Sequence, residues 1–186
     1  MKEMCKKKFS THQATLIQNT DRFLIIEWKR ADGSGDYYVN YIVDKKRGSL
    51  IVSGDLGDSI ATWYNPIKIC NLKNYVLDIE YYASKFQCSS DKYKFDPEDI
   101  LADIKEQATS LDFRIDDEQE FWENVESAIY DGGYNKDFIP SQELTDLVSE
   151  IDCDYFEWLY TCGRKIHIRV YLWAVGFNMA CEQLGF

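Results

Sequence analysis

Three runs of apolar and β-branched residues, separated by short turns, occupy residues 22–53 and constrain the fold most strongly. In the first run, 22–30, apolar side chains alternate with a second set that includes Glu27 and Lys29, which is typical of a strand with one buried face. The runs at 37–44 and 49–53 follow after turns that contain glycine. A further strand is expected at 13–18. The pattern predicts an N-terminal antiparallel β-meander of three to four strands.

Helical signals replace the strand alternation in the rest of the chain. A short helix is expected at 58–64 and a longer one at 71–86, where apolar residues recur at helical spacing. Asp96, Asp117, Ser141 and Asp154 are predicted to cap further helices, and the apolar segment 166–184 is predicted to form the last helix. The expected fold class is therefore α+β, with about six helices packed on or beside the sheet.

The charges are distributed unevenly between the two halves. Residues 1–90 carry 13 basic and 10 acidic side chains, a net charge of +3, whereas residues 91–186 carry 8 and 22, a net charge of −14. The segment 96–157 contains 20 acidic residues and only three basic ones. The sequence thus predicts a β-meander with short helices over 1–90 and an acidic helical part over 91–186, together forming one compact unit. Such asymmetry usually bears on the choice of partner.

Composition excludes several classes. No run of about 18 apolar residues is present, so no membrane association is expected, and Met1–Lys8 is not followed by the apolar region of an export signal. A cytoplasmic location with reduced thiols is therefore expected, and Cys70, Cys153, Cys162 and Cys181 are predicted to be core residues. No metal site is expected because no cysteine pair has zinc-site spacing. The net charge of −11 argues against direct binding to DNA.

Catalytic motifs are sparse. The sequence contains neither a Walker-type phosphate loop nor a G-x-S-x-G elbow, and no catalytic or cofactor-binding residue is assigned. The Gly54–Asp58 segment would suit either an ordinary turn or an anion or Mg²⁺ site. Glu27 and Lys29 share one strand face, as in metal-dependent nucleases, with Asp21, Asp36 and Asp44 as candidate further ligands.

The acidic residues of the carboxyl half are the strongest candidates for a binding surface. Carboxylates at three- and four-residue spacing line up on a helix face and repel one another. They form either a solvated surface or a mimic of a phosphate row that occupies a basic nucleic-acid channel. Glu143, Asp146 and Glu150 continue the acidic trend. The predicted partner-binding residues are Asp96, Glu98, Asp99, Asp103, Asp116, Asp117, Glu118, Glu120, Glu123, Glu126, Asp152, Asp154 and Glu157.

Four segments carry a family resemblance: 32–38, 47–65, 84–91 and 169–184. They resemble a family of small proteins of phages and mobile elements that includes type II-A anti-CRISPR proteins, and the resemblance is weakest through 110–141. It implies a non-enzymatic inhibitor, without cofactor, that binds the Cas9–guide RNA complex and blocks target DNA binding or cleavage. Two alternatives remain open: a nuclease-like enzyme using Glu27 and Lys29, and a phage accessory protein that binds another host nucleic-acid-handling protein. The oligomeric state is left open.

Overall fold

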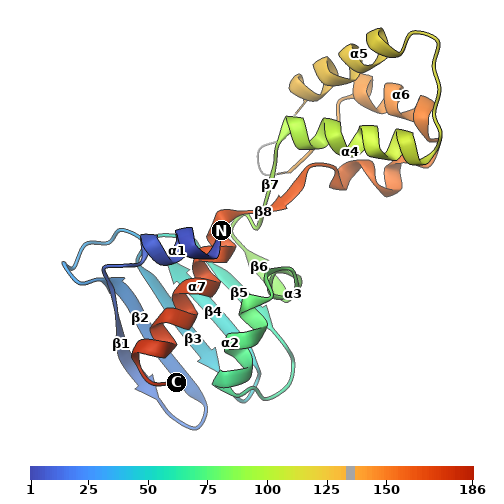
Figure 1. The fold of residues 1–186 in the computed structure, drawn as a ribbon. Helices are drawn as coiled ribbons and strands as arrows, with labels where there is room; N and C mark the ends of the chain where they lie inside the picture. The colour runs from blue at the N-terminus through green and yellow to red at the C-terminus, as the bar shows by residue number, and fades with distance from the viewer. Residues whose placement is uncertain (133–136) are drawn as a thin grey trace. The chain divides into compact units, whose positions relative to one another are not determined.

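The computed structural model describes residues 1–132 and 137–186, and the chain forms two compact units (Figure 1). The first, here called the sheet unit, comprises residues 1–92 and 167–186. The second, the acidic unit, comprises residues 93–166. The chain leaves the sheet unit after Lys92 and re-enters it at His167, whose backbone N–H donates to the Lys92 carbonyl oxygen over 2.8 Å.

A six-stranded antiparallel sheet forms the first unit, with its strands in sequence order from edge to edge. Turns and short loops join β1 to β5 in up-and-down order, whereas the connection from β5 to β6 contains two helices. The strands are β1 (His12–Asn19), β2 (Phe23–Arg30), β3 (Val39–Asp44), β4 (Ser49–Gly54), β5 (Ser59–Thr62) and β6 (Phe86–Ser89).

Helices α1 (Lys2–Lys8), α2 (Ile69–Leu77), α3 (Ile79–Ser84) and α7 (Ile168–Gln183) complete this unit. Figure 1 shows α1, α2 and α7 over one face of the sheet. Helix α7 is buried along most of its length and contributes Trp173 and Phe177 to the core, where the Phe177 ring lies 5.4 Å from that of Tyr41. Alternation along β2 brings Trp28 to the same core with no exposed surface, so the helix-covered face is the hydrophobic face of the sheet.

The acidic unit is helical. Strands β7 (Tyr93–Phe95) and β8 (Arg164–Ile166) pair where the chain enters and leaves it. Between them lie α4 (Pro97–Ser110), α5 (Glu118–Tyr130), α6 (Gln142–Ile151) and the 3₁₀ turns η1 (Tyr155–Glu157) and η2 (Leu159–Thr161). Its separate hydrophobic core includes Ile104, Val125 and Val148, one from each long helix.

The α+β class is confirmed, and so is the antiparallel sheet at the N-terminus, which has two more strands than the four expected. The helix predicted at 58–64 is wrong, because Ser59–Thr62 is β5 and pairs with β4. Ser59 and Ala61 are buried while Ile60 is exposed, which is strand alternation. The segment 71–86 holds two helices, since the carboxylate of Asp78 accepts from the Tyr81 N–H and starts α3. Asp154 precedes only a 3₁₀ turn.

The predicted division at residue 90 lies close to residue 92, where the chain leaves the sheet unit. The prediction did not include the later return of the chain to the sheet unit at residue 167. Residues 167–186 belong to the sheet unit, because α7 packs on the hydrophobic face of the sheet. The expected single compact unit is therefore corrected to two. With this division the sheet unit carries a net charge of +3 and the acidic unit −14.

Among the described residues, no helix combines the length and the apolar composition needed to cross a lipid bilayer.

Candidate functional site

Nine of the thirteen predicted interface carboxylates are exposed in the acidic unit. Helix α5 contributes four of them, because its buried face is limited to Phe121, Val125, Ala128 and Ile129. The exposed members are Glu98, Asp116, Asp117, Glu118, Glu120, Glu123, Glu126, Asp154 and Glu157.

Three of the remaining members stabilise helix α4 or its contact with the segment at Gly163–Lys165. Asp96 caps α4 by accepting from the Glu98 N–H over 3.2 Å. Asp99 forms an ion pair of 2.5 Å with Lys165. Asp103 accepts a 2.7 Å hydrogen bond from the N–H of Gly163. These half-buried carboxylates stabilise the fold, so the structure gives them a role that the predicted interface did not anticipate.

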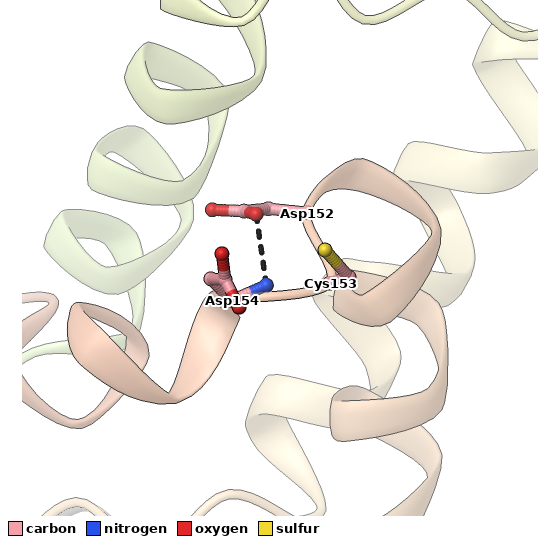
Figure 2. A group of neighbouring side chains, drawn as sticks. All are labelled: Asp152, Cys153 and Asp154. Atoms are coloured by element: carbon pink, nitrogen blue, oxygen red, sulfur yellow. Dashed lines mark hydrogen bonds between the residues drawn. The ribbon is translucent and has the colours of Figure 1, made fainter.

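Asp152 also has a structural role (Figure 2). One carboxylate oxygen accepts from the Asp154 N–H over 2.9 Å, and the other accepts from the indole Nε1–H of Trp158 over 2.8 Å. The Trp158 bond is the larger cause of a pKa below the ordinary range for the Asp152 carboxyl. The side chain therefore fixes the turn between α6 and η1.

Asp152, Cys153 and Asp154 could each offer one ligand atom to a metal, all within 4.8 Å of one another. No other such group occurs in the part of the chain that the structure describes. Cys153 and Asp154 are exposed, however, and both oxygens of Asp152 already accept hydrogen bonds. The geometry is that of a capped turn.

A shallow groove between α5 and α6 brings carboxylates from both helices together. Asp117 and Glu120 from the start of α5 and Glu150 from the end of α6 line it around a volume of about 240 Å³. Glu150 is absent from the predicted interface, because helical periodicity does not reveal which helix ends meet. The apolar floor and remaining wall consist of Ile115, Phe121, Asn124 and Leu147.

Few opposite charges balance this surface. Two ion pairs join described residues of the acidic unit, Arg114–Asp112 at 2.6 Å and Lys165–Asp99. Asp117 caps α5 through a 3.2 Å bond from the Glu120 N–H, and the helix dipole favours the carboxylates of the first turn. The helix dipole stabilises Glu123 and Glu126 much less, because these outward carboxylates lie further along α5. Repulsion between carboxylates is therefore expected to destabilise this surface at low salt.

Glu27 and Lys29, the candidate nuclease pair, form an ion pair of 2.6 Å on β2. The residue opposite Glu27 on β3 is Asn40, and the one on β1 is Thr15. Two of the carboxylates considered as further ligands are engaged elsewhere: Asp36 with Arg30 at 3.2 Å, and Asp44 with Arg22 at 2.9 Å. Glu27 is not part of the metal-compatible group described above.

The Gly54–Asp58 segment connects β4 to β5 rather than a strand to a helix. The Asp55 carboxylate accepts from the Tyr37 N–H over 2.9 Å, and the Gly57 N–H donates to the Gly54 carbonyl oxygen. Gly57 has φ +86°, which favours glycine. These contacts account for the motif as turn chemistry.

The cysteine prediction is half correct. Cys162 and Cys181 are buried, and burial raises the pKa of each thiol to about 12. Cys70 and Cys153 are exposed, so their assignment to the core is wrong.

Comparisons of this chain with protein-family models, with curated proteins and with solved structures find no match.

Proposed function

We propose that this protein is a non-enzymatic inhibitor whose acidic unit binds a basic nucleic-acid-handling protein in place of its nucleic acid, and that the partner is guide-loaded Cas9. The observation that carries the proposal is the charge of the acidic unit, −14 over residues 93–166, presented by exposed carboxylates on α5 and around the α5–α6 groove. Helices hold the backbone of these groups in place, so little backbone conformational entropy is lost when they bind.

The choice of Cas9 rests on the motif resemblance described above and on general electrostatics. A Cas9 complex holds its nucleic acids in a positively charged channel and reads a short duplex motif with arginines. An acidic surface of this size is steered toward such a channel, with association that slows as salt rises.

The test is co-elution of the full-length protein with guide-loaded Cas9 and with Cas9 alone, at increasing salt. The expected result is a complex with the guide-loaded form that weakens as salt rises and that excludes target DNA. Absence of a complex with either form would refute Cas9 as the partner and would leave another basic host protein as the target.

A matched pair of variants tests the surface itself. E118K/E120K/E123K reverses three exposed charges on α5, and D21K/E80K/E182K reverses three exposed charges of the sheet unit. The first variant should lower the association rate at low salt by roughly tenfold or more. The second variant should lower the association rate much less. Equal effects of the two variants would show that overall charge, rather than the α5 surface, governs binding.

A further inference from the structure

The sheet unit has an outer face, opposite the face that α1, α2 and α7 cover, and four isoleucines form one line across it. Ile25 lies opposite Ile42, Ile42 opposite Ile51, and Ile51 opposite Ile60, so the line crosses β2, β3, β4 and β5. These four residues are called the isoleucine row.

The row is under-packed compared with the covered face. The inward neighbours along the same strands, Leu24, Tyr41 and Val52 among them, are fully buried. None of the four isoleucines is, and Ile60 has 36% of its surface exposed. Adjacent isoleucines on exposed strands form a contiguous apolar patch, which in soluble proteins commonly marks an interface.

The charges beside the row differ in sign between its two sides. At the β3–β4 turn, Lys46 and Arg47 are exposed and line a hollow of about 590 Å³ together with Ile51 and Ile60. On the other side, the exposed Asp58 lines a hollow of about 480 Å³ with the same two isoleucines. Among the described residues, no ion pair involves Lys46, Arg47 or Asp58.

Two further pairs of charged side chains near the row form ion pairs. Glu27 and Lys29 pair on the Asp58 side. Arg22 and Asp44 pair on the Lys46 side. Of the charged side chains that line the two hollows, those without an ion pair are two positive groups on one side of the apolar strip and one negative group on the other.

We propose that this outer face is the interface of a homodimer, in which two copies pack sheet against sheet. A two-fold axis that runs parallel to the isoleucine row, midway between the two sheets, stacks the row of one copy on that of the other. It also brings the side of each copy that carries Lys46 and Arg47 over the side of its partner that carries Asp58. A two-fold contact is self-complementary by construction, and face-to-face packing of two sheets is a common architecture.

Charge favours a second copy over an acidic partner. A uniformly acidic surface would be attracted to Lys46 and Arg47 but repelled by Asp58. A second copy offers a negative group to the positive side and positive groups to the negative side, and its own isoleucine row covers the isoleucines of the first copy. The inference is independent of the proposed function.

The first measurement is the molar mass of the full-length protein in solution by light scattering and sedimentation equilibrium at micromolar concentrations. A mass twice the 21.8 kDa of the chain is expected. The variant I51E should give the monomer mass, because it places a charge in the centre of the apolar contact. L111E, which changes an exposed leucine of the acidic unit, should remain dimeric. A monomeric wild-type protein at 100 μM, or a dimeric I51E, would overturn the proposal.

A charge exchange provides a test that does not alter the isoleucines. D58K makes both sides of the row positive, and K46E/R47E makes both sides negative. Each variant alone should dimerise at least tenfold more weakly than the wild type, through repulsion. An equimolar mixture should recover the dimer mass as a heterodimer, because each positive side then meets a negative one.

Failure of the mixture to associate would refute the two-fold arrangement. Chemical cross-links from Lys46 to the acidic unit of the same chain, in a monomeric protein, would assign the face to an intramolecular contact instead.

Discussion

The phenolic O–H of Tyr41 donates a 3.0 Å hydrogen bond to the backbone carbonyl oxygen of Trp173, and both side chains are fully buried. The bond joins β3 to α7 across 132 positions of sequence. It thereby holds α7, the helix that follows the acidic unit in the chain, against the centre of the sheet. Gly176 lies nearby on α7, where an added Cβ would come within 2.5 Å of the Tyr41 oxygen and 3.2 Å of the Phe9 ring.

This proximity predicts an energetic coupling between residues 41 and 176. Tyr41→Phe should cost about 0.5–1.5 kcal/mol, because it removes one buried hydrogen bond. Gly176→Ala in the wild type should cost about 1–3 kcal/mol through overpacking, despite the better helix propensity of alanine. In the Tyr41→Phe background the alanine has more room, so its cost should fall by at least about 1 kcal/mol.

Denaturant unfolding of the four proteins measures this coupling, and circular dichroism confirms that each is folded. Additive effects of the two substitutions would contradict the close approach of Tyr41 to Gly176.

Asp152 predicts a pH-dependent contribution to the stability of the acidic unit. Its pKa in the folded state lies below the ordinary value of 3.8, because Trp158 and the Asp154 N–H bind the charged carboxylate. A group with a depressed pKa stabilises the fold above its unfolded pKa and loses that effect as pH falls through the folded value. Asp152→Asn should therefore lower the midpoint of thermal unfolding by several degrees at pH 7 and by much less below pH 3.

Thermal unfolding of the wild type and Asp152→Asn between pH 2.5 and 7 checks this expectation, with Glu157→Gln as an exposed control. If the difference in unfolding midpoint between the two proteins stayed constant over this range, the two hydrogen bonds would not favour the charged form of Asp152 over the neutral form.

The six thiols are predicted to separate into two reactivity classes. Cys70, Cys88 and Cys153 are exposed, whereas Cys5, Cys162 and Cys181 are buried. Burial also raises the pKa of the latter three, which suppresses the reactive thiolate. A thiol reagent at pH 8 should modify three cysteines of the native protein rapidly and all six only after denaturation.

Mass spectrometry of the modified peptides identifies the reactive positions. Rapid labelling of Cys181 in the native protein would contradict the packing of α7 on the sheet.

Local sequence signals were sufficient for most of the elements. Strand alternation located β2, β3 and β4, and capping residues located the starts of α4, α5 and α6, because these signals act within a few residues. Strand β5 was mistaken for a helix because a run of four residues with Ile60 and Thr62 is too short to distinguish the two periods. Its assignment depends on pairing with β4, which local sequence does not encode.

Contacts between distant segments explain the remaining differences. The return of α7 to the sheet depends on Tyr41 and Trp173, which are far apart in sequence. The structural roles of Asp99 and Asp103 depend on Lys165 and Gly163 at the other end of the acidic unit. That Glu120 and Glu150 line the same groove likewise depends on the packing of α5 on α6. Composition showed that the region is acidic, but not which carboxylates remain free.

The acidic unit should be stabilised by salt if its exposed carboxylates repel one another. Glu118, Glu120 and Glu123 lie within two turns of α5, and the Debye length falls from about 30 Å at 0.01 M to about 8 Å at 0.15 M ionic strength. The midpoint of thermal unfolding should therefore rise between these two conditions. E118Q/E120Q/E123Q should raise the midpoint at 0.01 M and reduce its dependence on salt, whereas D21N/E80Q/E182Q in the sheet unit should change both less. Calorimetry at the two ionic strengths measures both quantities for each protein. If salt left the wild-type midpoint unchanged, repulsion among these carboxylates would be negligible, and the surface would carry its charge without the strain inferred from its geometry.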